Sequence, residues 1–303
     1  MINAIKTYIN NCEKCKSMKP SNKISKPPMG NQFLTNRPFE RFYCDFLGPY
    51  PSTKVKNTII FICLDHFTKF IFLKPLKAAT SANVITYFQT EIFPTVGTPR
   101  YIHSDNGKQF VSNEMKAFFK LHHITHITTG FYAPQSNASE RSNREIITKI
   151  RCFLQDQKDH SNWDQYIPQI LSILRSDYHS SIKCSPYYAL FGQNMVQHGS
   201  TYKVLDRLGC LSGEDFNISK NIDKLNHVRE KIRTNLNLAH ERACKTYNLR
   251  TRPISFQIGQ IVFKRNHILS NMSKKINRKF MPKYIKCKIM NKIGNNLYDI
   301  VDI

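Results

Sequence analysis

Three short segments carry carboxylates whose types and surroundings suit metal-assisted chemistry. Asp45 lies in FYCDFLGPY, Asp105 in HSDNGKQF and Glu140 in APQSNASERSNRE. Hard divalent cations bind carboxylate oxygens, and Mg²⁺ keeps several waters and substrate phosphate oxygens as well. Three carboxylates could hold two such ions roughly 3.5 to 4 Å apart, one beside the attacking oxygen and one beside the leaving oxygen of an in-line displacement. Such a reaction requires no covalent enzyme intermediate.

Each carboxylate also has an ordinary structural interpretation. Asp45, inside an apolar strand, could be a charge on a solvated strand face. Asp105 begins Asp-Asn-Gly, which by itself predicts a turn. Glu140 stands three residues after Asn137 and could complete a capping box, or pair with Arg144 one turn on. Taken together, a strand end, a turn and a helix start favour a shared site, because these features meet where an α/β sheet presents its ligands.

A fourth carboxylate competes for the same role. Asp65 ends an apolar run in ICLDHFTKF. The physical chemistry of the sequence alone does not rank it below Asp45.

The segments that must position these residues follow two patterns. Aromatic and β-branched runs between residues 41 and 74 predict strands joined by tight connections. A helix is expected over 81–93, closed by Pro94 and Gly97, and a long helix opens near Asn137. Between these two helices the pattern alternates strand, helix and strand. Strands that first meander and then alternate with helices predict a mixed α/β sheet flanked by helices.

The charge of the chain indicates a polyanionic partner. Its 303 residues contain 45 Lys and Arg against 21 Asp and Glu, a net charge of +24. Such a field attracts phosphate backbones. The longest apolar run, residues 59–64, is far short of the roughly 20 residues needed to cross a bilayer, so no membrane association is expected. Nine cysteines without a disulfide framework indicate reduced thiols in the cytosol or nucleus.

The second half of the chain contains three further segments. Residues 199–219 read as a polar loop, and residues 222–247 carry a helical apolar row that suits a connecting or self-associating helix. Ile285, Cys287 and Ile289 then alternate with lysines before a turn at 294–296, which predicts a small β module.

The three acidic segments resemble the DDE core of retroviral-type integrases, and their sequences are closest to those of gypsy-type LTR retrotransposons. The resemblance covers residues 41–50, 101–110 and 132–144. It implies an RNase H-like core in which Asp45, Asp105 and Glu140 bind two Mg²⁺ or Mn²⁺ ions, with Asp65 non-catalytic. The 34 residues between Asp105 and Glu140 are one fewer than is usual in that family. Asn137 stands where the family commonly has glycine.

The two ends of the chain extend the resemblance. Cys12-x-x-Cys15 has the spacing of half a zinc site, although on its own it reads as two surface thiols. In the family it is the cysteine half of a His-His-Cys-Cys module, so Zn²⁺ is not expected to bind unless histidines come from upstream or from a partner. The last fifty residues resemble the SH3-like barrel that follows the core.

Cations in the core helix and in the tail are expected to contact nucleic acid, although solubility alone is an alternative role. The sequence KKINRK could also direct nuclear import. The candidate contacts are Arg144, Lys149, Lys264, Arg265, Lys274, Lys275, Arg278, Lys279, Lys286 and Lys288.

The expected organisation has five parts. They are a partial zinc module (1–20), a linker (21–40), an RNase H-like catalytic core (41–198), a loop and connecting helix (199–252) and a basic SH3-like module (253–303). The expected function is retroelement integration: metal-dependent trimming of a DNA 3′ end and strand transfer to target DNA by a homo-oligomer in the nucleus after synthesis in the cytoplasm. The alternatives are a non-catalytic DNA- or chromatin-binding derivative and another RNase H-like nuclease or transposase.

Overall fold

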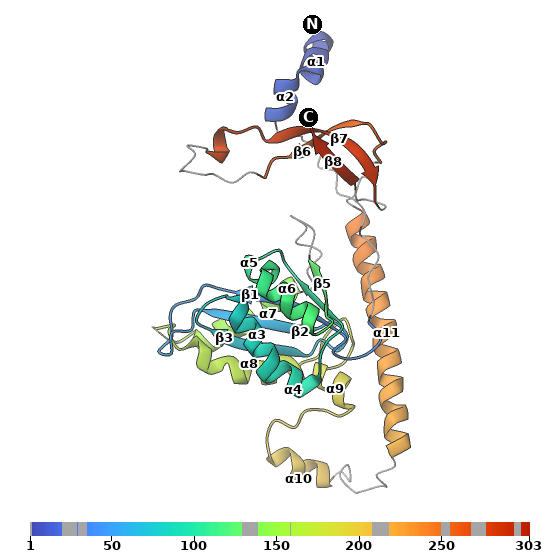
Figure 1. The fold of residues 1–303 in the computed structure, drawn as a ribbon. Coiled ribbons are helices and arrows are strands. Elements are labelled where there is room, and N and C mark those ends of the chain that lie inside the picture. The colour runs from blue at the N-terminus through green and yellow to red at the C-terminus, as the bar shows by residue number, and fades with distance from the viewer. Residues whose placement is uncertain are drawn as a thin grey trace. The chain divides into compact units, whose positions relative to one another are not determined.

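The computed structural model describes most of the chain in two separate units (Figure 1). One unit comprises residues 32–240 and the other comprises residues 1–31 with 241–303. The described residues are 2–19, 29, 35–128, 139–157, 159–207, 218–249, 255–267, 277–293 and 298–303, without the side chains of 139–141, 205, 206 and 218–222.

The larger unit is built on a five-stranded mixed sheet with the order β3-β2-β1-β4-β5. The strands β1 (Arg41–Leu47), β2 (Ile59–Asp65) and β3 (Ile71–Leu76) form an antiparallel meander. On the other side of β1, β4 (Tyr101–Ser104) and β5 (Thr125–Thr128) run parallel to it. The meander followed by parallel strands confirms the mixed sheet expected from the sequence.

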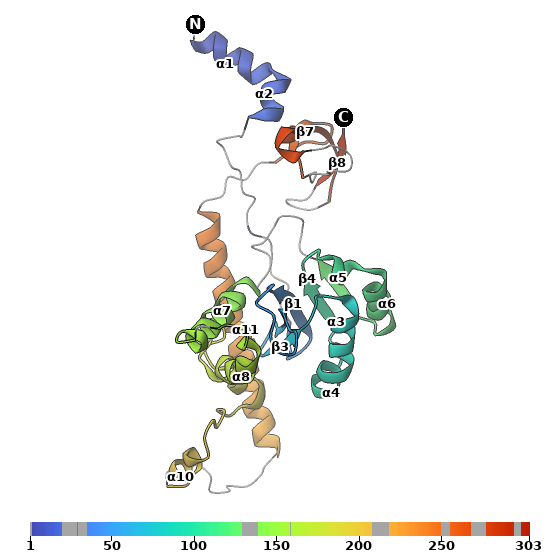
Figure 2. The same cartoon turned by 90° about the vertical axis from the view of Figure 1, so that its left-hand side faces the viewer.

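Helices cover both faces of this sheet, because alternate residues of the inner strands are apolar on each side. Figure 2 shows α3 to α6 on one side of the sheet and α7 and α8 on the other. On the first side Phe42, Cys44 and Phe61 join the core, and on the second Tyr43 and Ile62 do so. The elements of the first side are α3 (Ser81–Tyr87), the π-helical η1 (Phe88–Ile92), α4 (Phe93–Val96), α5 (Lys108–Val111) and α6 (Asn113–Leu121); those of the second are α7 (Ser139–Leu154), the 3₁₀ turn η3 (Trp163–Tyr166) and α8 (Ile167–Ser176).

The helix expected over 81–93 differs from the prediction in one respect. Pro94 does not close it but lies in the first turn of α4, after the π-helical segment. The backbone is helical on both sides of Pro94, and the π-helical segment before it accommodates a residue that has no N–H. The helix ends at Gly97, whose φ of 81° lies in the left-handed region.

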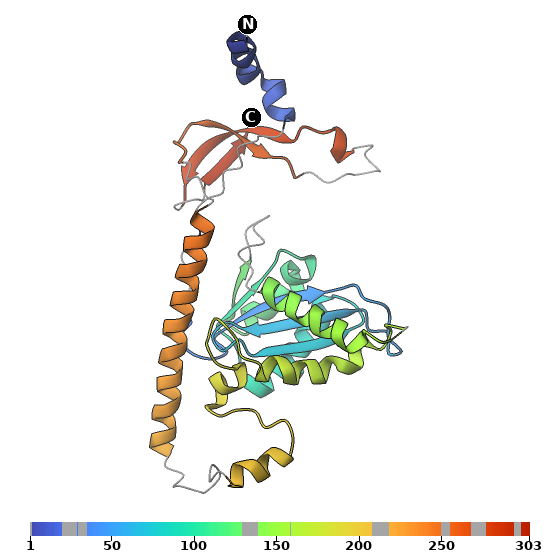
Figure 3. The ribbon, with the colours of Figure 1, turned by 180° about the vertical axis from the view of Figure 1, so that it is seen from behind.

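The long helix α11 (Ile218–Asn248) packs on the core over its middle turns (Figure 3). Val228, Ile232 and Leu236 are buried there against a cluster that includes Phe67 and Ile182. Before it lie α9 (Pro186–Phe191) and α10 (Ser200–Arg207). The expected loop at 199–219 is therefore wrong for residues 200–207, and residues 208–217 lie outside the described part.

The smaller unit combines two helices with a three-stranded antiparallel sheet. The helices are α1 (Ile2–Asn11) and α2 (Glu13–Met18), and the strands are β6 (Ile261–Arg265), β7 (Tyr284–Lys292) and β8 (Tyr298–Asp302), with a 3₁₀ turn η4 (Arg278–Phe280). Cys287 and Ile289 are buried while Lys288 is exposed, which confirms the alternation expected along this strand. The described residues of this unit form no closed barrel, and the expected turn at 294–296 lies outside them.

Among the described residues, no helix has the length and apolar character needed to span a bilayer.

Candidate active site

The register of two parallel strands brings Asp45 and Asp105 to the same level. In the β1–β4 pair Tyr43 lies opposite His103. Continuing this register by two residues places Asp45 beside Asp105, just past the end of β4. Neighbouring strands lie about 4.8 Å apart, and residues opposite each other point to the same face. By this continuation, two of the three predicted carboxylates are expected near the carboxyl ends of adjacent strands, where α/β sheets present ligands.

A hydrogen bond joins Asp45 to helix α7. The Asn143 side-chain amide donates to Asp45 Oδ2 at 2.9 Å, and the backbone N–H of Phe46 donates to Oδ1 at 2.8 Å. Asp45 is half-buried at this point. Glu140 precedes Asn143 by three residues on α7, so both positions lie on one face of that helix. The N-terminal half of α7 is thus joined to the strand that carries Asp45.

Asp105 is exposed and folded into a tight turn. Its Oδ1 accepts a hydrogen bond from the backbone N–H of Gly107 at 3.0 Å. A Cβ at Gly107 would lie 2.9 Å from this same Oδ1 and 2.4 Å from the Gln109 side chain. The turn expected from Asp-Asn-Gly is therefore present. Its hydrogen bond from Gly107 orients the Asp105 carboxylate, so the turn and a functional role are compatible.

Two residues before the aspartates on their strands lies an uncharged aromatic pair. The rings of Tyr43 and His103 are 4.8 Å apart between centroids. Burial, assisted by the nearby charges of Arg41 and His126, lowers the pKa of His103 to about 4. Both ring nitrogens of His103 are buried without a hydrogen-bond partner. At neutral pH the His103 imidazole is therefore neutral and adds no positive charge next to Asp105.

The sheet register excludes Asp65 from this site. Asp65 lies opposite Phe42 in the antiparallel β1–β2 pair. Its position is three residues, or about 10 Å, from Asp45 along β1 and on the other face. Its carboxylate is fully buried and accepts hydrogen bonds from the Phe39 N–H and from both the N–H and hydroxyl of Thr68. Burial raises the pKa of Asp65 against the opposing effect of these bonds.

The third predicted ligand is described only through its backbone. Glu140 lies in the first turn of α7, but its side chain is outside the described part of the chain, as are Asn137 and the expected capping arrangement. Among the side chains that are described, no three His, Cys, Asp or Glu residues come together as a metal site. The donors of Asp45 and Asp105 are carboxylate oxygens, the type that Mg²⁺ prefers, so the two residues fit a divalent hard cation.

The predicted nucleic-acid contacts lie in both units. In the core, Arg144 is exposed on α7, and Lys149 pairs with Asp177 at 2.6 Å.

In the tail, Lys264 pairs with Asp302 and Lys286 pairs with Glu13 at 2.5 Å. The tail charge is therefore partly compensated, which the absence of acidic residues between 253 and 297 did not reveal. Arg265, Arg278, Lys279 and Lys288 are exposed, and Lys274 and Lys275 lie outside the described residues.

The two cysteines of the predicted half zinc site lie at the start of α2. Cys12 is its N-terminal flanking residue and Cys15 lies in its first turn, and both are half-buried. Hydrogen bonding from the backbone and thiol of Cys15 lowers the pKa of Cys12. The described side chains offer no histidine pair to complete a zinc site with them.

Two site residues were not found by reading the sequence. Asn143 was quoted only as part of a motif, and His103 only as part of a strand. The signal for Asn143 was its spacing of three from Glu140, which places it on the same helical face. His103 lies two residues before Asp105 in a strand, and this spacing predicts the same face of the sheet.

Comparison with known proteins assigns the class of the core. Residues 35–134 match the family model described as the integrase core domain. The matched residues include Asp45 and Asp105 and the five strands of the sheet. Residues 35–134 of this chain are therefore similar to integrase core domains.

Particular relatives agree with this assignment. The Pro-Pol polyprotein of feline foamy virus is 28% identical over 191 residues, which cover 62% of this chain and 16% of the polyprotein. The Transposon Tf2-3 polyprotein of Schizosaccharomyces pombe is 23% identical over 301 residues, covering 98% of this chain and 22% of that protein. The chain thus spans about a fifth of the length of these relatives.

Solved structures give weaker similarities. A simian T-cell lymphotropic virus intasome in complex with PP2A regulatory subunit B56 gamma aligns with a TM-score of 0.48 and 18% identity, covering 62% of this chain and 66% of that one. The HTLV-2 integrase catalytic core domain in complex with magnesium aligns with a TM-score of 0.40 and 23% identity, covering 50% and 95%. The assignment of the core rests on the sequence match rather than on these superpositions.

Proposed function

We propose that this chain is a retroelement integrase that trims a DNA 3′ end and joins it to target DNA. The observation that supports the proposal is the parallel β1–β4 register, which, if continued by two residues, would set Asp45 level with Asp105, on the strand that Asn143 of α7 contacts. A site open to solvent at Asp105 can accept a phosphodiester from a long polymer. The net charge of +24 favours DNA as that polymer.

Three residues of the chain have assigned roles in this proposal. Asp45, Asp105 and Glu140 would hold two Mg²⁺ or Mn²⁺ ions, which supply charge stabilisation for the attacking and leaving oxygens. Asp45 is oriented by Asn143, and Asp105 by its own turn. The protein contributes position and electrostatics, as expected for phosphoryl transfer.

The reaction has two displacements that balance without a covalent enzyme intermediate. In the first, water attacks a phosphodiester near the element's end and releases a short strand, leaving a free 3′ hydroxyl. In the second, this hydroxyl attacks a target phosphodiester, forms a new phosphodiester and releases a target 3′ hydroxyl. Both steps use the same two aspartates and Glu140.

The partners and the tail complete the proposal. Double-stranded DNA would bind as both element end and target, and a homo-oligomer would bring two ends together in the nucleus. Residues 253–303 would form an SH3-like DNA-binding module around the three-stranded sheet. In support, the likeness of this chain to the Tf2-3 polyprotein extends over 98% of its length, beyond the core.

The test is a strand-transfer assay with a labelled duplex end in Mg²⁺. Asp105→Asn and Glu140→Gln should each abolish joined product while leaving DNA binding nearly intact, because each removes a metal-binding charge without changing the side-chain size. Asp156→Asn provides the matched control, since it neutralises an exposed core carboxylate away from the site and should retain activity.

The products distinguish the remaining possibilities. Joined product from either site variant at the normal rate would refute the assigned roles. Cleaved product alone from the unaltered chain would indicate a nuclease. Binding without any product would indicate a DNA-binding derivative of an integrase.

A further inference from the structure

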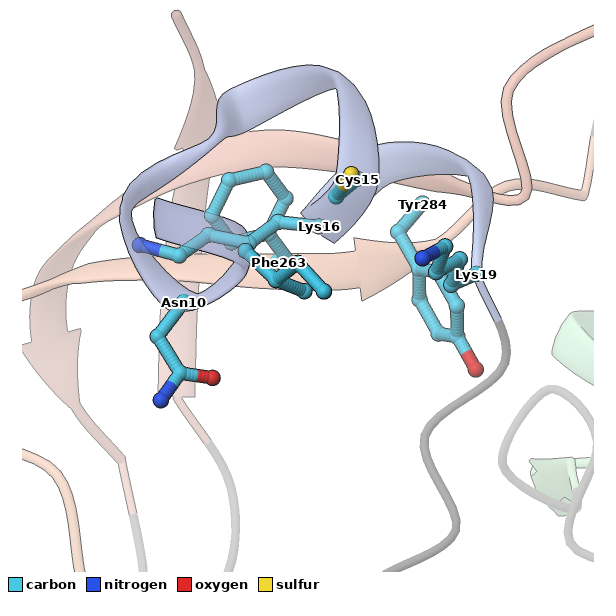
Figure 4. A pocket seen from close by; sticks show the side chains of 7 residues that line it. Asn10, Cys15, Lys16, Lys19, Phe263 and Tyr284 are labelled. Carbon is cyan, nitrogen blue, oxygen red and sulfur yellow. The ribbon is translucent and has the colours of Figure 1, made fainter. Parts of the chain in front are cut away.

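We propose that a pocket in the smaller unit binds one unstacked nucleobase of a single-stranded nucleic-acid segment. The pocket has a volume of about 400 Å³ and lies between α1–α2 and the strands β6 and β7 (Figure 4). This volume is within the roughly 300 to 1,000 Å³ range of small-ligand pockets. The proposal goes beyond strand transfer in the core and does not depend on it.

The strands give the pocket two aromatic walls. Phe263 and Tyr284 both line it, and Figure 4 shows them rising from the strands beneath the α2 segment. In the β6–β7 register Phe263 lies opposite Lys286, and Arg265 lies opposite Tyr284. Because opposite residues share a face, each aromatic ring has a cation beside it on the same surface. Aromatic side chains interleaved with cations are typical of surfaces that bind single-stranded nucleic acid.

The helical side of the pocket carries the charge for the flanking phosphates. Lys16 and Lys19 line the pocket and are exposed, and its lining contains no acidic residue. The nearest acid on the helix, Glu13, is already paired with Lys286 at 2.5 Å. This ion pair connects α2, which carries Lys16, to β7, which carries Tyr284.

The charge of the unit decides which kind of occupant fits. Residues 1–31 and 241–303 contain 20 Lys and Arg and 4 Asp and Glu, a net charge of +16. A second copy of this unit would bring the same charge to the pocket and be repelled there. A nucleic acid brings compensating phosphates.

The shape of the pocket favours a single strand over a duplex. In a duplex each base is stacked between its neighbours and paired, so its faces cannot contact Phe263 or Tyr284. A single strand can turn one base out at little energetic cost, while its backbone follows the lysines.

The test measures base stacking separately from charge attraction. A single-stranded oligonucleotide with one central 2-aminopurine is titrated with the full chain, and the emission of that base reports its stacking. We expect the emission to change on binding. Phe263→Leu should remove this change and weaken binding about tenfold, because one stacking contact is lost.

Charge variants test the two lysines. Lys16→Gln with Lys19→Gln should reduce the slope of log affinity against log salt by about 1.4, since each lost contact to a single strand is worth about 0.7. The matched control, Lys6→Gln with Lys14→Gln, removes the same charge from α1 and α2 outside the pocket lining. It should leave both the emission change and the slope unaltered.

Several results would overturn the proposal. One is an emission change that survives both Phe263→Leu and Tyr284→Leu. Another is equal affinity for an oligonucleotide with an abasic residue at the central position, a comparison that needs no protein variant. A concentration-dependent dimer that Phe263→Leu abolishes, with no emission change in the unaltered chain, would assign the pocket to self-association. The Asp105→Asn chain should keep the emission change, which separates this proposal from the fate of strand transfer.

Discussion

At the scale of single residues, the candidate site depends on side chains that orient other side chains. Asp45 has one oxygen bound to its own following N–H and the other to Asn143. A carboxylate fixed in this way presents its remaining lone pairs in set directions. Asn143 contributes by holding Asp45 and, through α7, by fixing the turn that contains Glu140.

Replacing Asn143 should therefore impair chemistry more than binding. We expect Asn143→Ala to lower the rate of strand transfer about 10-fold to 150-fold, equivalent to about 1.5 to 3 kcal/mol for a hydrogen bond to a charged group. The measurement is the single-turnover rate together with DNA affinity. Thr148→Ala is a suitable control, because the Thr148 hydroxyl donates to the Arg144 carbonyl on the same helix. Equal losses in affinity and in rate would contradict an orienting role.

The sequence located the two aspartates but could not decide between Asp45 and Asp65 on physical grounds. Both follow apolar runs, and both could end strands. The difference arises from pairing: Asp65 lies opposite Phe42, on the other face of β1. Pairing register is a long-range property, so in advance only the resemblance to integrases favoured Asp45 over Asp65.

At the scale of elements, the strands were more predictable than the helices. The strands β1 to β3 are short apolar runs between polar breaks, and this local pattern predicts them directly. The π-helical segment before Pro94 and the helix α10 were not predicted. Both depend on how the backbone accommodates a proline or a polar sequence in context, which periodicity does not report.

The helix α11 shows how an apolar row can be read in two ways. Its row suited either a connecting or a self-associating helix, and the structure buries the middle of the row against the core. Ile232 is 1% exposed, whereas Leu238 is 42% exposed on the same helix. The free energy of packing α11 on the core should therefore depend on Ile232 and not on Leu238.

Substitution of these two residues measures that contribution. Ile232→Ala should lower the free energy of unfolding by about 2 to 5 kcal/mol, because it removes a buried side chain and leaves a cavity. Leu238→Ala should change it by less than about 1 kcal/mol. Urea denaturation of the two variants checks both values. Similar losses of unfolding free energy in the two variants would show that burial of Ile232 does not anchor α11 to the core.

At the scale of the whole molecule, the distribution of charge is the main feature. The smaller unit holds +16 of the net +24, although it contains fewer than a third of the residues. This net value already includes Glu13 and Asp302, which pair with Lys286 and Lys264. The net charge of this unit should dominate the salt dependence of DNA binding.

Removal of residues 253–303 tests this expectation. The affinity of the full chain for duplex DNA should fall with log salt at a slope of about −0.9 per neutralised phosphate, and the shortened chain should have a flatter slope. The Asp105→Asn chain is a control, since it retains every cation. An unchanged slope after the deletion would remove the tail from the account of DNA binding.

At Gly107, the need for a small residue to leave room for a candidate site carboxylate can be distinguished from a need for glycine in folding. Its φ of −56° is open to any amino acid, so the backbone there does not need a glycine. The obstacle to a larger residue is the carboxylate oxygen of Asp105 together with the Gln109 side chain. A selection for stability alone would tolerate many residues at position 107, and a selection for DNA joining would keep the smallest.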